Sequence, residues 1–228
     1  MKKIVILTGA GMSADSGLKT FRDHDGLWEG HDVMEVASPE GWESDRELVL
    51  DFYNQRRRNL LDAKPNAGHE ALTKLEEKFT VEIITQNVDD LHERAGSMNV
   101  HHLHGELFKV RSTGDPYLVY EWKKDLNTGD MCEKGYQLRP NIVWFGEAVP
   151  MIEKAAQITS QADILIIIGT SLAVYPAAGL IHYAQDNIPK YLVDPKTPHG
   201  VHLSNIKFIQ QTAQNGVPTL VEEILNEE

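Results

Sequence analysis

The sequence predicts an α/β fold in which a mostly parallel sheet carries helices on both faces. Short apolar runs alternate with stretches of helical periodicity along almost the whole chain. Several of these runs are apolar at every position, which is typical of strands that are buried on both faces. The 228 residues are enough for one large hydrophobic core with a smaller additional lobe.

The individual elements follow from the same alternation. Strands are expected at the apolar runs 3–9, 81–85, 100–105, 141–146, 162–171, 190–195 and 206–210. Helices are expected where apolar residues recur at helical spacing, at 13–20, 45–62, 66–78, 88–96, 150–161, 176–186 and 216–226. Strands that are separated by helices in this way pair in parallel, because each crossover returns the chain to the same end of the sheet.

Two segments interrupt the alternation and predict a smaller lobe over the ligand edge of the sheet. The first, 23–66, has no convincing strand and contains a polar loop followed by one helix, and its part 29–66 is expected to belong to the small lobe. The second, 107–138, is rich in turn residues and has a possible hairpin around YLVYEW. We therefore expect a large lobe of about 1–28, 67–106 and 139–228, and a small lobe of one helical insertion and one ribbon.

Composition and charge exclude several classes of protein. The net charge of −12 argues against binding to DNA, RNA or anionic lipid, which all require basic surface. No apolar run approaches the ~20 residues of a membrane helix, and the first run, IVIL, is shorter than the ~7–15 apolar residues of a signal peptide. We expect a cytoplasmic monomer without nucleic-acid or membrane partners.

The chain has one cysteine, Cys132. It cannot form an internal disulfide, which fits a reducing compartment, and it cannot build a cysteine-rich zinc site. A nucleophilic role is not expected, because neither a helix N-terminus nor a histidine lies near it in the sequence.

A glycine-rich turn follows the first expected strand. The run GAGMSA, from Gly9 to Ala14, fits the pattern G-x-G-x-x-G/A, in which backbone amides approach the pyrophosphate of a dinucleotide. The strand before it and the helix expected after it favour a Rossmann-like nucleotide site. However, the acidic residue that normally follows ~20 positions later on a second strand is missing. The motif therefore indicates either a variant nucleotide fold or a chance match.

Five motifs, taken together, decide between these alternatives. They are GAGMSADSGLKTFRDHDGLW (9–28), TQNVDDLHERAG (85–96), HLHGE (102–106), LRPNIVWFGE (138–147) and GTSLAVYPAAG (169–179). In this order and spacing they resemble the sirtuin family of NAD-dependent protein-lysine deacylases. The resemblance covers about residues 4 to 195 and implies NAD as cofactor and acyl-lysine proteins or peptides as substrates.

The resemblance implies that His104, in HLHGE, is the catalytic base. Imidazole suits the reaction, because the base must take a proton from a ribose hydroxyl near neutral pH. His102 shares the face of His104 if the strand is regular. The HHLH run also allows buried structural histidines or a partial metal site, but no third ligand lies nearby, and we expect no metal.

The resemblance also assigns the NAD-binding positions. They are Gly9, Ala10, Gly11, Met12, Ser13, Asp15, Phe21, Arg22, Gln86, Asn87, Val88, Asp89, Gly169, Thr170 and Ser171. The amide and carboxylate groups of the QNVDD run suit nicotinamide, whose carboxamide both donates and accepts hydrogen bonds. The same run is typical of a helix N-terminus, and both interpretations can hold. The GTS run can equally be a plain strand-to-helix turn.

The chain departs from the family in two places. Most sirtuins hold a structural zinc with four cysteines in the segment that here has only Cys132 and no histidine. We expect no zinc, and we expect packing by Tyr117, Leu118, Val119, Tyr120, Trp122 and Tyr136 to replace it. The family asparagine at the adenosine ribose is also missing. Asp194 is a possible replacement, and Ala213 a possible backbone contact to adenine.

The helix at 45–62 carries an arginine on its apolar stripe. Arg56 shares helical spacing with Val49, Tyr53 and Leu60, whereas Arg57 and Arg58 can point to water. A guanidinium stays charged, so burying Arg56 requires a negative partner. A carboxylate of the protein, such as that of Asp51 or Glu47, could be this partner.

The resemblance suggests a second partner for Arg56. The spacing Y-x-x-R of Tyr53 and Arg56 matches the class III branch, whose members remove succinyl, malonyl or glutaryl groups. Ala37 is small where the branch accommodates a longer acyl chain, and Val143, Phe145, Gly146 and Glu147 resemble the edge to which the substrate peptide adds as a strand.

The sequence therefore predicts an NAD-dependent lysine deacylase that prefers acidic acyl chains. Alternatives remain within the same fold: a general deacetylase, an NAD hydrolase or a mono-ADP-ribosyltransferase. A module that only binds NAD or ADP-ribose is disfavoured, because it would not need a base such as His104.

Overall fold

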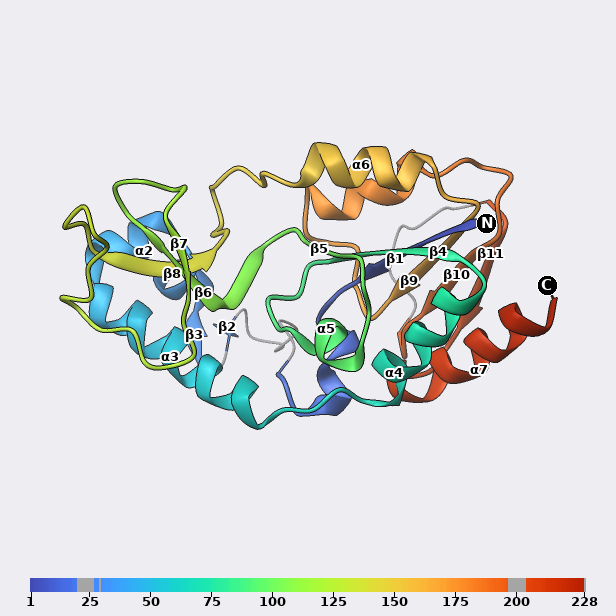
Figure 1. Cartoon of the computed structure of the whole chain (residues 1–228), viewed down its shortest axis with the longest axis horizontal. Coiled ribbons are helices and arrows are strands. Elements are labelled where there is room, and N and C mark those ends of the chain that lie inside the picture. The colour runs from blue at the N-terminus through green and yellow to red at the C-terminus, as the bar shows by residue number, and fades with distance from the viewer. Residues whose placement is uncertain (20–26, 29, 197–203, 228) are drawn as a thin grey trace.

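The computed structural model describes residues 1–19, 27–28, 30–196 and 204–227. Two lobes lie side by side, with the parallel sheet in one and a smaller antiparallel sheet in the other (Figure 1). No helix in the described part of the chain is long and apolar enough to cross a membrane.

The larger lobe is built on a parallel sheet, as predicted. Among the described residues the sheet has six strands in the order β11-β10-β9-β1-β4-β5, and every neighbouring pair is parallel. The strands are β1 (Lys3–Thr8), β4 (Thr80–Thr85), β5 (Val100–His102), β9 (Ile164–Ile168), β10 (Lys190–Val193) and β11 (Ile206–Ile209). The predicted α/β fold of Rossmann-like type is therefore confirmed.

Both faces of the sheet are covered, and β1 shows how. Ile4 and Ile6 belong to one core cluster and Val5 and Leu7 to another, because successive side chains of a strand point to opposite faces. The first face is covered by α4 (Ala67–Thr73), the 3-10 turn η3 (Lys74–Glu77) and α7 (Ala213–Glu227). The second is covered by α6 (Ile152–Ser160) and η4 (Ala177–Tyr183) (Figure 1). Helix α5 (Leu91–Ala95) follows β4.

The smaller lobe combines helices with an antiparallel sheet. The helices are α1 (Val33–Val36), α2 (Pro39–Ser44) and α3 (Arg46–Asp62), and the sheet has the order β7-β6-β8, with β6 (Gly105–Ser112), β7 (Val119–Glu121) and β8 (Leu138–Ile142). The two-residue strands β2 (Leu27–Trp28) and β3 (His31–Asp32) form a separate antiparallel pair. Helices and sheet share one apolar core, so two segments far apart in the sequence fold as a unit.

Several predicted elements were wrong. The expected helix at 13–20 is replaced in its described part by 3-10 turns, η1 (Ala10–Met12) and η2 (Ala14–Ser16), which end at Gly17 with φ of 89°. The expected strand at 141–146 ends at Ile142 as β8, and it pairs antiparallel with β6 in the small sheet. Strand β6 and helices α1 and α2 were not predicted, because their apolar faces are completed only by contacts between the two insertions.

The aromatic residues expected to hold the ribbon together do so only in part. Leu118, Tyr120 and Trp122 are partly buried against the small core, but Tyr117, Val119 and Tyr136 are exposed. The buried side chains of β6, β8 and the turn between β7 and β8 are instead Leu107, Phe108, Val110, Leu126, Cys132, Leu138 and Ile142. The ribbon is thus anchored by its contacts with α3 rather than by an aromatic cluster of its own.

The buried arginine of α3 is Arg57, not Arg56. The Arg57 side chain is fully buried, its Nη1 donates to Oδ1 of Asn54 at 2.7 Å, and its Nε donates to the carbonyl of Leu107 at 3.2 Å. Burial lowers the pKa of Arg57 to about 10. Arg57 lies four residues after Tyr53 and three before Leu60, so it fits the buried stripe as well as Arg56 does.

Candidate active site between the two lobes

A cavity lies at the carboxyl ends of β1, β4 and β9 and extends to α3 and β8. Open α/β sheets bind ligands at this edge, at the point where the chain leaves neighbouring strands in opposite directions. Most of the predicted site residues line the cavity: Gly9, Ala10, Ser13, Ala37, Tyr53, Arg56, Gln86, Asn87, Val88, Asp89, His104, Val143, Phe145, Gly146, Glu147, Gly169, Thr170 and Ser171.

The glycine loop and the loop after β9 form the floor of the site together. The amide of Gly11 donates to the carbonyl of Gly169 at 2.8 Å, and a Cβ on Gly11 would lie 2.6 Å from the Cα of Gly169. Gly169 itself has a φ of 61°. Gly11 is therefore required for contact between the two loops, and its side of the loop does not line the cavity.

Some predicted cofactor positions lie away from the cavity. Met12 is buried in the core, Asp15 is exposed, and Ala213 is buried at the start of α7. Asp194 is buried and accepts from the amide of Lys196 at 2.9 Å. None of these side chains is in the cavity lining, and Phe21 and Arg22 lie outside the described residues.

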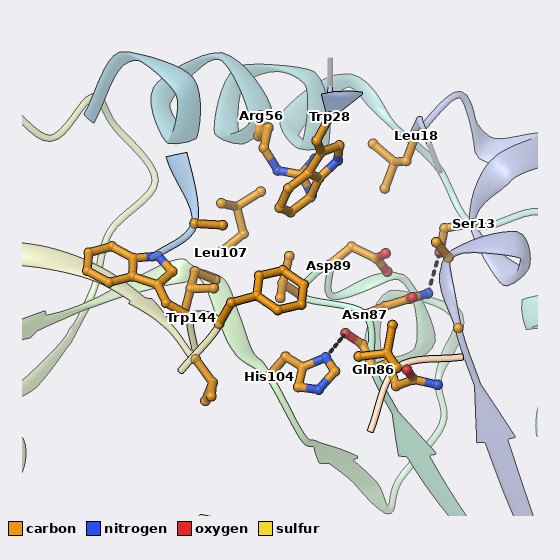
Figure 2. Close-up of a pocket in the computed structure, with 18 of the residues that line it drawn as sticks. Ser13, Leu18, Trp28, Arg56, Gln86, Asn87, Asp89, His104, Leu107 and Trp144 are labelled. Carbon is orange, nitrogen blue, oxygen red and sulfur yellow. Dashed lines mark hydrogen bonds between the residues drawn. The ribbon is translucent and has the colours of Figure 1, made fainter. Parts of the chain in front are cut away.

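His104 lines the cavity as a neutral imidazole with a free lone pair, which is the state that a general base requires. Its Nδ1 lies 3.1 Å from the carbonyl oxygen of Gln86, which can only accept, so Nδ1 carries the proton and Nε2 has the free lone pair (Figure 2). Burial lowers the pKa of His104, and the bond to Gln86 offsets this only in part. The imidazole is therefore neutral at neutral pH and can accept a proton.

His102 has a different environment from His104. Its Nδ1 lies 2.9 Å from the carbonyl oxygen of Asn87, and its Nε2 lies 2.7 Å from Oε1 of Glu93. Burial lowers the pKa of His102, but the hydrogen bond and charge of Glu93 outweigh burial, so the net pKa is raised. His102 is thus a positioning group for the 86–89 loop and not part of the cavity lining.

A polar cluster lies at the end of β4. Nδ2 of Asn87 donates to Oγ of Ser13 at 3.1 Å (Figure 2). Nε2 of Gln86 donates to Oγ1 of Thr170 at 3.1 Å. Burial raises the pKa of Asp89, against a hydrogen bond from Ser13 that lowers it. Buried amide and carboxyl groups that face a cavity suit a ligand that donates and accepts hydrogen bonds, such as a carboxamide.

Tyr53 and Arg56 bring α3 into the site. The hydroxyl of Tyr53 accepts from Nε1 of Trp144 at 3.1 Å, and burial raises the pKa of Tyr53 to about 12. The guanidinium of Arg56 lies 4.1 Å from the ring centroid of Trp28 and 5.6 Å from that of Phe52. In Figure 2, Arg56 and Trp28 lie on the α3 side of the cavity and His104 on the opposite side.

Two backbone amides of the predicted peptide edge already form hydrogen bonds within the protein. The amide of Val143 donates to the carbonyl of His104 at 2.9 Å, and the amide of Phe145 donates to the carbonyl of Ala37 at 2.9 Å. The carboxylate of Glu147 binds Arg139 at 2.7 Å and Arg111 at 3.0 Å.

Glu147 also accepts from the amide of Trp144 at 2.8 Å. Its carboxylate is therefore committed within the protein. Glu147 lines the cavity, but its charge is already paired, so its side chain helps to shape the cavity wall and is not expected to bind the substrate by charge.

Sequence reasoning missed several cavity residues. They are Gly17, Leu18, Lys19, Trp28, Asn59, Leu60, Leu107, Ile142, Trp144, Val149, Val174, Tyr175 and Pro176. Nine of them lie inside motifs that the sequence singled out: Gly17, Leu18, Lys19 and Trp28 in 9–28, Ile142 and Trp144 in 138–147, and Val174, Tyr175 and Pro176 in 169–179. Leu107 carries no comparable signal, because only the folded small lobe brings it to the site.

In the described part of the chain Cys132 does not lie among metal ligands. Cys132 is buried, and its Sγ lies 3.3 Å from Oγ of Ser112. Among the described residues no group of three histidine, cysteine, aspartate or glutamate side chains is placed to hold a metal ion.

Comparison with known proteins agrees with the geometry. The Sir2 family model matches residues 9–176. An NAD-dependent protein deacylase of Helicobacter pylori is 56% identical over 225 residues, covering 99% of this chain and 98% of the relative. An enzyme of the same name from Vibrio cholerae is 47% identical, covering 98% of this chain and 94% of the relative.

Solved structures show the same similarity. A Sir2 homologue mutant in complex with ADP-ribose matches with a TM-score of 0.90 and 37% identity, covering 99% of this chain and 93% of that one. A Sir2 homologue in complex with NAD matches with a TM-score of 0.89 and 37% identity, covering 99% and 90%.

The fold and the site thus define an enzyme of the NAD-dependent protein deacylase class. The chain belongs to the Sir2 family, the sirtuins.

Proposed function

We propose that this sirtuin prefers lysine acyl groups that end in a carboxylate, namely succinyl, malonyl or glutaryl. The products are deacylated lysine, nicotinamide and O-acyl-ADP-ribose. One observation carries the proposal: Tyr53 and Arg56, from one face of α3, line the same cavity as the base His104.

Tyr53 supports the proposal through the direction of its hydrogen bond. Because Trp144 donates to the hydroxyl oxygen, the phenolic hydrogen of Tyr53 remains to be donated elsewhere. With a pKa of about 12, the phenol stays protonated throughout the working range of the enzyme. A carboxylate that enters the cavity would receive a charge-assisted hydrogen bond from it.

Arg56 supplies positive charge on the same side of the cavity. Its guanidinium is held against the Trp28 ring, and an apolar surrounding strengthens its attraction for an entering carboxylate. Ala37, which is buried and small, adds room at the cavity wall. Acetyl-lysine has no carboxylate, so it gains nothing from the pair.

The residues present fit NAD. The loops at Gly9–Ser13 and Gly169–Ser171 would hold its phosphates and ribose, and Asn87 and Asp89 its carboxamide. When bound, NAD supplies a ribose carbon from which nicotinamide leaves. Nε2 of His104, with its free lone pair, would take a proton from a ribose hydroxyl, and Val143 and Phe145 would line the path of the acyl group.

The experiment supplies NAD with succinyl-lysine, acetyl-lysine or unmodified lysine peptide and identifies the products by mass. The proposal predicts O-succinyl-ADP-ribose and a higher kcat/KM for the succinyl peptide than for the acetyl peptide. Nicotinamide release that is equal without acyl peptide would indicate an NAD hydrolase. ADP-ribose attached to the peptide would indicate a transferase, and an acetyl preference would indicate a general deacetylase.

We also propose that the small lobe folds without zinc. We propose separately that the protein is a cytoplasmic monomer. Three features support folding without zinc: the single cysteine, the apolar core that α3 shares with β6 and β8, and the side chain of Gln137. Nε2 of Gln137 lies 3.0 to 3.1 Å from the carbonyl oxygens of Asn127, Asp130 and Leu138, which share its two hydrogens. These hydrogen bonds hold together the turn between β7 and β8, the segment in which a bound zinc ion would otherwise supply folding energy.

A further inference from the structure

Two buried histidines lie behind the polar cluster that faces the cavity. His69 on α4 and His92 on α5 are 0% and 1% exposed, and their ring centroids are 4.9 Å apart. Neither side chain lines the cavity. However, Nε2 of His69 lies 3.4 Å from Oγ of Ser13, a residue that does line it.

The hydrogen-bond partners of His69 fix its tautomer. The backbone amide of Asn66 points at Nδ1 of His69 at 3.3 Å, as part of a capping box at the start of α4. An amide N–H can only donate, so Nδ1 is the unprotonated nitrogen. Burial lowers the pKa of His69 to about 4, so the ring is neutral and its single proton lies on Nε2. His69 therefore donates to Ser13.

The hydrogen bond from His69 fixes which partners of the Ser13 hydroxyl donate to it and which one accepts from it. Its oxygen accepts from Nε2 of His69 and from Nδ2 of Asn87, which fills both lone pairs. Its own hydrogen is then donated to Asp89, the remaining partner of Ser13. Figure 2 shows the Ser13–Asn87 bond that closes this side of the cavity.

The direction of the hydrogen bond at Ser13 also fixes the orientation of the Asn87 side-chain amide. Because Ser13 accepts, Asn87 must present its Nδ2 to Ser13, which leaves Oδ1 as an acceptor for the ligand. If Ser13 instead donated to Asn87, the amide would turn, and Asp89 would lose the bond from Ser13. Nicotinamide would then meet a different set of donors and acceptors.

We propose that His69 is a positioning residue of the nicotinamide pocket: its Nε2–H holds the Ser13 hydroxyl so that Asn87 and Asp89 present one defined pattern of acceptors. His92 has no such connection. Its Nε2 contacts Oγ1 of Thr8 at 3.1 Å and does not reach Ser13. The two histidines are equally buried, and only one is placed to act on the ligand.

Two substitutions separate this role from the capping of α4. His69→Asn places an oxygen near the Nδ1 position, where it still accepts from the Asn66 amide, but it has no group that reaches Ser13. His69→Gln places an amide N–H2 near the Nε2 position, where it can still donate to Ser13. Thermal unfolding measures the capping loss in both variants.

The readout is the affinity for ligands with and without nicotinamide. Dissociation constants for NAD and for ADP-ribose are measured by calorimetry, together with inhibition of deacylation by nicotinamide. For His69→Asn we expect Kd for NAD and Ki for nicotinamide to rise about tenfold, and Kd for ADP-ribose to change by less than about twofold, because one buried hydrogen bond is lost and its partner left unsatisfied. His69→Gln should restore both constants.

Three results would overturn the proposal. They are unchanged nicotinamide affinity in His69→Asn, an equal loss of ADP-ribose affinity, and equal losses in the Asn and Gln variants. If His69→Asn does not fold, His69→Gln carries the test alone. It should keep the parental ratio of NAD to ADP-ribose affinity, and a ratio reduced by more than about threefold contradicts the proposal.

Discussion

The indole Nε1 of Trp144 lies 3.1 Å from the hydroxyl oxygen of Tyr53, and both side chains are buried. The Trp144 ring is fixed in turn by the guanidinium of Arg139, which lies 3.3 Å from its centroid and is paired with Glu147. The orientation of the Tyr53 hydroxyl therefore depends on the ion pair between Arg139 of β8 and Glu147, neither of which belongs to α3.

Trp144→Phe should reduce selectivity for acidic acyl chains. The substitution keeps most of the packing but removes the donor to Tyr53, so the phenolic hydrogen is no longer directed. We expect kcat/KM for a succinyl peptide to fall about fivefold, and that for an acetyl peptide by less than about twofold. Trp42→Phe is the matched control, because Trp42 is a buried neighbour of Trp144 at 5.7 Å. Equal losses on both peptides would show that Trp144 only packs.

Arg57→Ala should destabilise the protein much more than Arg58→Ala. Arg57 is buried and bonded to Asn54 and Leu107, so its loss leaves a cavity and an unsatisfied carbonyl, at about 2–4 kcal/mol. The side chain of Arg58 is half-exposed and pairs with Asp125, an interaction worth under about 1 kcal/mol. Urea unfolding followed by circular dichroism compares the two, and similar free energies of unfolding would contradict the buried role of Arg57.

The pH profile should report the neutral form of His104. Because the base acts when neutral and its pKa is lowered from 6.5, kcat/KM should stay level through 6.5 and fall only when the pH drops through the lowered value. Measurement of kcat/KM from about pH 5 to about pH 8 tests this. An acidic limb centred above 6.5 would mean that the free enzyme holds His104 protonated.

The purified protein should hold no stoichiometric zinc and should be insensitive to chelators. Its small lobe has one cysteine and is held together by an apolar core that it shares with α3. A chelator should therefore not unfold it. Elemental analysis after dialysis against a chelator, with thermal unfolding before and after, measures both. One tightly held zinc per chain would contradict the proposal.

The sheet could be predicted because its strands carry their own signal. Runs such as the one around Ile164–Ile168 are apolar at every position, and this pattern needs no tertiary information. Strand β6 has no such signal. It alternates between the small core and solvent, and its register with β8 is irregular between Gly105 and Val110, so its partner could not be inferred locally.

The site could be predicted where a motif holds adjacent residues and not where distant elements meet. His104, Asn87 and Asp89 lie together because each follows the end of a strand in the same sheet. The choice between Arg56 and Arg57 could not be made from periodicity, because both fit the stripe through Tyr53 and Leu60. It is decided by the carbonyl of Leu107, which lies on another insertion.

The most direct test of the proposed acyl preference compares Arg56→Met with the parent protein on matched succinyl and acetyl peptides. We expect kcat/KM for the succinyl peptide to fall roughly thirtyfold, which corresponds to about 2 kcal/mol for a lost charge-assisted bond. The value for the acetyl peptide should change by less than about threefold, because no carboxylate meets Arg56. Equal losses on the two peptides, or a parent that prefers acetyl, would contradict the account.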